Sequence, residues 1–362
     1  MVFFNSIIIP CKPCLGADPQ VSAGSAILYD RVTKEILYAK DINKQRPPAS
    51  TTKIMTGILA IEMGSPDDEV VISPYAASLG GTSLYLKEGE VWKIEDLLLG
   101  TLLKSGNDAA AALGEGIAGS EALFVEIMNK KAFLLGASST NFRNTNGLPK
   151  EGHVSSSYDL AVIADYALNN PVFADIVSTK DALVKDHNNT RQHNLRNTNQ
   201  LLGSYKGANG VKTGTTNAAG QCLVASAERG SRKLISVVLK SGDRYGDSRR
   251  LLNSGFEDYC LFTIPKGTVV GRMYFSKAVP YQVDLVTTKD CSYTVSMDRL
   301  GAHEKKLVLE SAGLPLKGSE KVGYLEIKAN EQYKIPVTVA DKVRKETLSD
   351  CIKKICMAIY ID

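Results

Sequence analysis

The sequence has no strong excess of charge of either sign. Its 362 residues carry 43 Lys and Arg against 39 Asp and Glu, a formal net charge of +4. A surface that binds nucleic acid is normally a strongly basic patch with aromatic side chains among the cations, and no stretch of the chain has that pattern. We therefore exclude nucleic acid as a partner.

Cysteine and histidine are too few and too scattered to indicate a metal centre. The seven cysteines are odd in number and widely spaced, which does not indicate a disulfide framework. Cys11 and Cys14 have the spacing of a redox or metal pair, but no second pair accompanies them, and the four histidines lack ligand spacing. We expect neither a metal ion nor a cofactor.

Long apolar runs are also missing after the N-terminus. No later stretch approaches the ~20 apolar residues of a membrane-spanning helix, so the bulk of the chain is predicted to be soluble. An apolar run over 2–9 precedes small residues at Gly16 and Ala17, like the end of a secretory signal peptide, but no basic residue precedes it and Pro10 and Lys12 cut it short. We assign residues 1–20 to a leader or its remnant; the alternative is a disordered tail.

The segment from 47 to 64 carries the first candidate for chemistry. Its apolar residues recur at helical spacing, which predicts a helix from near Ser50 to Gly64. Positions three apart share a helix face, so the Lys53 amine is expected one turn from the Ser50 hydroxyl. A lysine that stays partly neutral can take the serine proton and so create a nucleophile. Taken alone, such a pair is more often an N-cap serine followed by an exposed lysine.

The hydrophobic pattern indicates an α+β fold over residues 21–262. Short runs at 25–29 and 35–39 predict a β-hairpin, and strand character returns at 222–227 and 234–239. Helices are predicted at 94–103, 109–117, 122–135, 158–168 and 244–256. This order is typical of an antiparallel sheet flanked by helices, with an inserted all-helical lobe.

The pattern changes to short strands from about residue 264. They are predicted at 269–275, 279–286, 292–296, 306–310, 322–327 and 333–339. We expect a small all-β domain over 263–341 with no chemical role, because it lacks a constellation of Ser, Lys and Asp.

Residues 342–362 form the last predicted segment. They combine basic residues with apolar ones at helical spacing, namely Leu348, Ile352, Ile355 and Ile359. This pattern predicts an amphipathic helix that lies at a membrane surface or packs on the β domain.

Two further motifs complete a set of three. Ser105-Gly106-Asn107 lies at the break between two predicted helices, and Lys212-Thr213-Gly214-Thr215 lies at a predicted strand edge. Each is common alone. Ser-x-x-Lys, Ser-x-Asn and Lys-Thr-Gly in this order are typical of penicillin-binding proteins and class A β-lactamases.

From about Val21 to the C-terminus, the chain resembles the low-molecular-mass penicillin-binding proteins, the serine-type D-alanyl-D-alanine carboxypeptidases. Beyond the three motifs, the likeness includes Asn146-Gly147-Leu148 with His153, and the predicted β domain and terminal helix match the family's layout. The resemblance implies a penicillin-binding fold and an extracytoplasmic enzyme, peripheral on the outer face of the cytoplasmic membrane. Such an enzyme removes the terminal D-alanine from peptidoglycan stem pentapeptides and binds β-lactam antibiotics.

The resemblance also implies a role for each motif residue. Ser50 is the expected nucleophile, Lys53 accepts its proton, and Ser105 relays a proton to the leaving amine. The family's oxyanion donors are the backbone N–H groups at the positions of Ser50 and Thr215. The expected substrate-binding residues are Asn107, Lys212, Thr213, Gly214, Thr215 and Arg244.

Two alternatives use the same motifs differently. A class A β-lactamase needs a glutamate that activates water for rapid deacylation. The loop 138–157 offers only Glu151, which does not suit that role, so β-lactams are expected to inhibit. The second alternative is a cell-wall-binding protein with an inactive site, and the intact set of motifs argues against it.

Overall fold

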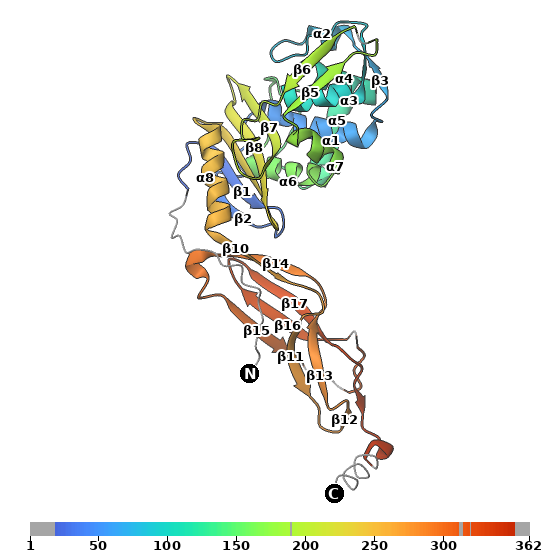
Figure 1. Ribbon diagram of the computed structural model, residues 1–362, viewed down its shortest axis with the longest axis vertical. Helices are drawn as coiled ribbons and strands as arrows, with labels where there is room; N and C mark the ends of the chain where they lie inside the picture. Colours follow the sequence, from blue (N-terminus) through green and yellow to red (C-terminus); the bar gives the residue numbers. More distant parts are fainter. Residues whose placement is uncertain (1–18, 189, 311–313, 319, 352–362) are drawn as a thin grey trace. The chain divides into compact units, whose positions relative to one another are not determined.

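The computed structural model describes residues 19–188, 190–310, 314–318 and 320–351 (Figure 1). These residues form two compact units that divide between Phe256 and Glu257. The first combines helices with an antiparallel sheet, and the second consists mainly of strands.

A five-stranded antiparallel sheet, in the order β2-β1-β9-β8-β7, is the base of the first unit. Its strands are β1 (Ser25–Asp30), β2 (Ile36–Lys40), β7 (Ala208–Thr216), β8 (Gly220–Arg229) and β9 (Arg232–Ser241). Side chains alternate between the two faces of a strand. In β1, Ile27 therefore packs into the core beneath most of the helices, and Leu28 packs into a separate core with α8 (Arg244–Glu257).

Helices cover both faces of this sheet. Figure 1 shows α8 on one side of the strands and the other helices on the opposite side. The others are α1 (Lys53–Met63), α2 (Pro74–Ser78), α3 (Ile94–Leu99), α4 (Asn107–Ala118), α5 (Glu121–Leu134), α6 (Ser157–Ala167) and α7 (Pro171–Ser178). Two short hairpins accompany them, β3 (Glu69–Val71) with β4 (Val91–Lys93) and β5 (Asp181–Lys185) with β6 (Gln192–Arg196). The predicted α+β class with a helical lobe is confirmed.

Two helices begin or end differently from the prediction, and both differences lie beside the motifs. The helix expected from Ser50 begins with a 3-10 turn over Ala49–Thr52, and α1 follows from Lys53. The helix expected over 94–103 is regular only in α3 and then widens into a π turn over Gly100–Lys104. Such local irregularities depend on tertiary packing, which apolar spacing does not reveal.

In the described part of the chain, no single helix is long and apolar enough to cross a bilayer. The bent pair α6 and α7 passes the length and composition test only when its two helices are taken together.

The second unit contains a five-stranded sheet in the order β11-β13-β17-β16-β15. Its strands are β11 (Val269–Tyr274), β13 (Gln282–Thr287), β15 (Glu304–Leu309), β16 (Lys321–Lys328) and β17 (Gln332–Val339). A separate pair joins β10 (Tyr259–Ile264) to β14 (Cys291–Ser296) along its whole length. The predicted boundary at 262/263 therefore falls inside a strand of this unit.

One predicted strand of this unit is interrupted. The segment expected as one strand over 279–286 divides into β12 (Ala278–Val279) and β13, with Pro280 and Tyr281 between them. Proline has no backbone N–H to donate to a sheet, which explains the interruption.

The amphipathic helix predicted from Lys342 does not begin there. Val343 forms a β-bridge with Leu316, and β18 (Arg344–Lys345) pairs with β12. Helical backbone begins only at Leu348, whose side chain is exposed. The remaining apolar positions of that prediction, Ile352, Ile355 and Ile359, lie outside the described residues, as does most of the predicted leader.

Candidate active site

The Ser50 hydroxyl and the Lys53 amine lie next to each other at the start of α1. Lys53 Nζ is 3.2 Å from Ser50 Oγ, 2.8 Å from Asn107 Oδ1 and 2.6 Å from the carbonyl oxygen of Asn146. The Lys53 side chain is fully buried, whereas Ser50 is partly exposed. The structure therefore does not support the alternative in which Ser50 is only an N-cap and Lys53 is exposed to solvent.

The three oxygens around Lys53 determine which of them receives an N–H bond from the amine and which faces its lone pair. A protonated amine donates to all three, but a neutral amine has two N–H bonds and one lone pair. The amide oxygen of Asn107 and the carbonyl of Asn146 can only accept, so they take the two N–H bonds. The lone pair is then left for the Ser50 O–H, which is the arrangement of a general base beside a nucleophile.

Burial and a neighbouring cation favour the neutral amine. Desolvation lowers the pKa of Lys53 well below its usual value, and the positive charge of Lys212 lowers it further. The carboxylate of Asp108 acts in the opposite direction. Lys212 is itself buried, and desolvation and then Arg244 lower its pKa to about 7. The effect of Lys212 on the pKa of Lys53 therefore weakens as Lys212 itself loses its proton.

The second motif is positioned by the π turn and the start of α4. Ser105 ends that turn with φ of 71°, in the left-handed region, and is buried. Two residues later, Asn107 accepts from Lys53 and donates from Nδ2 to Gly80 O at 2.8 Å. Asn107 thus joins the Lys53 amine to the loop that contains Gly80 and Gly81, called the glycine-rich loop below. A direct link from the Ser105 hydroxyl to Ser50 stays a prediction.

The third motif lies in β7, which packs against the 3-10 turn Ala49–Thr52. We call this turn the Ser50 turn. A Cβ at Gly214 would stand 3.0 Å from the backbone nitrogen of Ser50 and 3.1 Å from Pro48 O, so only glycine allows this close approach without displacing a neighbour. Thr213 Oγ1 lies 2.7 Å from Thr198 Oγ1. The Lys212 amine donates to Thr213 O at 3.3 Å.

Arg244, the first residue of α8, reaches the end of the same motif. Its Nη1 donates to Gly214 O at 3.0 Å and to Thr215 Oγ1 at 2.7 Å. Its Nε is buried and has no hydrogen-bond partner among the residues that the structure describes. The guanidinium is therefore held at the end of the third motif.

Comparison with known proteins identifies the family. The model of the family Peptidase S11, D-alanyl-D-alanine carboxypeptidase, matches residues 14–242. The chain belongs to this D-alanyl-D-alanine carboxypeptidase family.

Relatives of the family resemble the chain over most of its length. The D-alanyl-D-alanine carboxypeptidase DacF of Bacillus subtilis (strain 168) is 33% identical over 345 residues, which cover 92% of this chain and 88% of that protein. The crystal structure of DacD from Francisella tularensis superposes with a TM-score of 0.75 at 26% identity, covering 95% of this chain and all of that one. Penicillin binding protein 5 from Haemophilus influenzae also gives 0.75, at 27% identity, covering 91% of this chain and all of that one.

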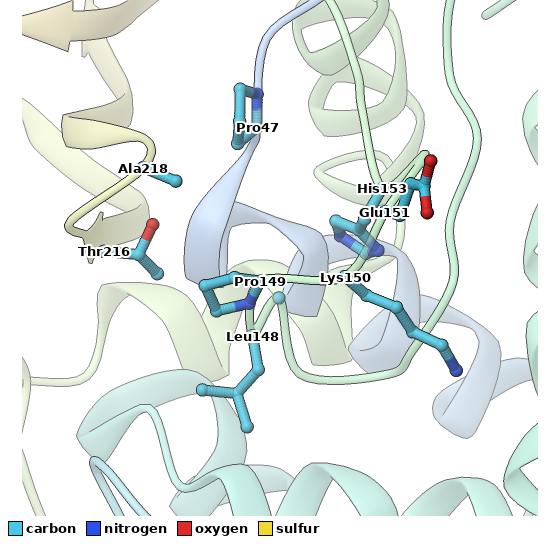
Figure 2. A pocket seen from close by; sticks show the side chains of 9 residues that line it. Pro47, Leu148, Pro149, Lys150, Glu151, His153, Thr216 and Ala218 are labelled. Carbon is cyan, nitrogen blue, oxygen red and sulfur yellow. The ribbon is translucent and has the colours of Figure 1, made fainter.

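A pocket of about 270 Å³ opens beside the Ser50 turn of this family member (Figure 2). It is lined by Pro47, Gly147, Leu148, Pro149, Lys150, Glu151, His153, Thr216 and Ala218. In Figure 2, the Glu151 carboxylate points away from Thr216 and Ala218. Within the described ranges, no group of three or more His, Cys, Asp or Glu side chains could hold a metal ion.

Sequence reasoning missed the part of the site that comes from the loop 141–153. The carbonyl of Asn146 contacts the Lys53 amine, and a Cβ at Gly147 would overlap the carbonyl oxygen of Ala49. A backbone carbonyl has no residue-type signal, so only the likeness in Asn146-Gly147-Leu148 marked this loop. His153, to which the sequence assigned no catalytic role, contacts Thr52 of the Ser50 turn.

Proposed function

We propose that this protein is a serine DD-carboxypeptidase that removes the terminal D-alanine from peptidoglycan stem pentapeptides. The observation that carries the proposal is the buried Lys53 amine, 3.2 Å from Ser50 Oγ, with its other two contacts occupied by acceptors. The names of its relatives in the family support the same activity.

The reaction begins with acyl transfer to Ser50. Lys53 Nζ takes the hydroxyl proton while Oγ attacks the carbonyl carbon of the penultimate D-alanine. The C–N bond of the tetrahedral intermediate then breaks, and the leaving amine receives a proton through Ser105. Free D-alanine departs, and the shortened peptide stays on Ser50 as an ester, which water hydrolyses in a second step.

The oxyanion of the tetrahedral intermediate needs donors that are in place before the reaction. We assign this role to the backbone N–H groups of Ser50 and Thr215. The close approach of Gly214 to the Ser50 nitrogen supports the assignment, because it brings the end of β7 to the same side of the nucleophile.

The substrate ends in a carboxylate, which requires a cationic anchor. Arg244 fits this role because its guanidinium is fixed on Thr215 Oγ1 and Gly214 O, at the end of the strand that carries the third motif. The Thr213 and Thr215 hydroxyls lie on the same strand, and Asn107 Nδ2 faces the glycine-rich loop, where the substrate amide is expected. The charge of Lys212 lowers the pKa of Lys53 and so favours the neutral amine.

We also propose that β-lactams acylate Ser50 and stay bound. Rapid hydrolysis in a class A β-lactamase depends on a glutamate that activates water. Glu151 is exposed, and its carboxylate points away from Thr216 (Figure 2). This position argues against that role, so slow deacylation is expected.

The proposed setting is the outer face of the cytoplasmic membrane. Peptidoglycan lies outside the cytoplasm, so the enzyme has to be exported, for which the apolar run in residues 1–20 is the candidate signal. In this proposal the unit up to Phe256 carries the catalysis, and the all-β unit and the terminal residues keep it near the membrane surface.

Fluorescent penicillin tests this proposal. The protein should form a covalent adduct that survives denaturing electrophoresis, and Ser50→Ala should abolish it. The wild-type enzyme should also release D-alanine from a peptide ending in D-Ala-D-Ala. An inactive cell-wall-binding protein would give neither signal, and rapid turnover of the penicillin would identify a β-lactamase.

A further inference from the structure

A chain of hydrogen bonds runs from the loop 141–153 to the peptide unit that precedes the nucleophile. The backbone N–H of Arg143 donates to His153 Nδ1 at 2.9 Å. His153 Nε2 lies 2.8 Å from Thr52 Oγ1, and Thr52 Oγ1 donates to the Ala49 carbonyl oxygen at 2.9 Å. The reaction proposed above uses none of these side chains.

The contacts fix the direction of each bond in this chain. Because Nδ1 of His153 accepts an amide N–H, the proton of the neutral ring is on Nε2. Nε2 therefore donates to Thr52 Oγ1, and the single hydroxyl proton of Thr52 goes to the Ala49 carbonyl. The ring is buried, and desolvation lowers the pKa of His153 to about 4, so this neutral form is present at neutral pH.

The last acceptor of the chain shares a rigid unit with the Ser50 N–H. The carbonyl of Ala49 and the N–H of Ser50 belong to one planar peptide group, and in a trans peptide the two bonds point in opposite directions. A contact that fixes the Ala49 oxygen therefore also fixes where the Ser50 N–H points. A hydrogen bond to the carbonyl also polarises the N–H of the same group.

This peptide unit needs outside support. Ala49 has φ of 51°, in the left-handed region that residues with a Cβ rarely adopt. Gly147 leaves just enough space for the Ala49 oxygen, and Gly214 approaches the Ser50 nitrogen from β7. These glycines restrict the unit by shape, and the Thr52 hydroxyl adds a side-chain hydrogen bond to its carbonyl, beside the backbone bonds of the 3-10 turn.

We infer that His153 is a positioning residue for the oxyanion hole, because through Thr52 and the Ala49 carbonyl it orients and polarises the Ser50 N–H. The inference rests on the proposed function, in which that N–H stabilises the negative charge of the acylation intermediate. His153 does not touch the substrate in this role. It acts through three successive hydrogen bonds on the peptide group at the nucleophile.

Two substitutions of His153 separate its two contacts. In His153→Asn, the amide oxygen can replace Nδ1 and still accept from Arg143, but the side chain is too short to reach Thr52. In His153→Gln, the longer side chain can place an N–H donor where Nε2 stands. The acylation rate of His153→Asn with penicillin is expected to fall about tenfold, less than the 10²–10³ that loss of a whole oxyanion donor costs. His153→Gln should retain most of the wild-type rate.

Substitutions of Thr52 interrupt the same chain at its next link. Thr52→Val removes the hydroxyl at nearly constant volume and should reproduce the fall in rate, whereas Thr52→Ser should restore it. Thr56→Val is the matched control. It removes another buried threonine hydroxyl, one turn further along in α1, whose bond goes to Thr145 O and does not involve residue 49.

The decisive readout is the infrared stretching frequency of the ester carbonyl in the penicilloyl-enzyme. Donors in the oxyanion hole polarise this carbonyl and lower its frequency. The band should therefore move to higher frequency in His153→Asn and Thr52→Val but not in His153→Gln, Thr52→Ser or Thr56→Val. A boronic acid that forms a tetrahedral anion on Ser50 should lose affinity in the same two variants.

The outcomes separate this inference from the proposed function. If the wild-type protein forms no penicilloyl adduct, both are overturned. If the adduct forms and the band and rate of His153→Asn match those of the wild type, only the inference is overturned. Should Thr52→Val not fold, as judged by circular dichroism, the pair His153→Asn and His153→Gln decides, and equal bands in these two variants refute the inference.

Discussion

Replacing Gly147 by alanine is predicted to damage both stability and acylation. Gly147 has φ of 87°, where an L residue costs roughly 1–2 kcal/mol relative to glycine. In addition, the new Cβ would overlap the carbonyl oxygen of Ala49 and stand 2.9 Å from the Ser50 nitrogen. One of these groups has to move, and the peptide unit that carries the Ser50 N–H lies directly in the way.

The expected loss of rate follows from this displacement. Removing one oxyanion donor typically lowers kcat by 10²–10³, or about 2.7–4 kcal/mol of transition-state stabilisation. We therefore expect Gly147→Ala to acylate with fluorescent penicillin about 10²-fold more slowly than the wild type in stopped-flow measurements. Its free energy of unfolding in urea should fall by about 2 kcal/mol or more, because overlap adds to the backbone strain.

Gly136 provides a matched control in the same unit. Its φ is 80°, close to that of Gly147, but a Cβ there would meet no atom within 4 Å. Gly136→Ala should therefore lose only the roughly 1–2 kcal/mol of backbone strain and keep the wild-type acylation rate. If Gly147→Ala acylates as fast as Gly136→Ala, the Ser50 peptide unit does not control the reaction in the way we describe.

Two further predictions concern the cations of the site. Acylation needs neutral Lys53, so its rate should rise with pH through the pKa of Lys53. Lys212→Met removes a cation that lowers this pKa, so the acid limb of the pH–rate profile should move to higher pH. An unchanged limb would contradict the electrostatic role of Lys212. Arg244→Gln should raise KM roughly tenfold for a peptide ending in D-Ala-D-Ala and leave KM nearly unchanged for the same peptide with an amidated C-terminus. Equal effects on the two peptides would show that Arg244 does not bind the terminal carboxylate.

The sequence was informative where chemistry depends on side chains at short spacing. Ser50 and Lys53 are three residues apart, so almost any helical start brings them together, and the structure does so even though the first turn is a 3-10 turn. The elements of the first unit that the sequence predicted follow from apolar periodicity for the same local reason, whereas α2, α7 and the β5–β6 hairpin were not predicted. Both kinds of inference need only the residues of one element.

Other features depend on contacts between distant segments and could not be predicted. The acceptor in Asn146 is a backbone carbonyl, and the support for Ala49 comes from Thr52 and His153, 101 residues apart in the sequence. Threonine and histidine in these positions are ordinary residues until the fold brings them together. The strand break at Pro280 is different, because the residue that causes it was visible in the sequence and its consequence was overlooked.

Three groups from separate parts of the chain converge on the single peptide unit between Ala49 and Ser50. Gly147 and Gly214 restrict it from two sides by close approach, and Thr52 holds its carbonyl by a hydrogen bond. Lys53, one residue beyond Thr52, holds the serine oxygen from the same helix. The nucleophile and its nearest oxyanion donor are therefore positioned by one short turn, so a change that tilts this turn should affect proton transfer and charge stabilisation together. Lys212→Met should instead act on proton transfer through the pKa of Lys53, and Arg244→Gln should act on binding of the terminal carboxylate.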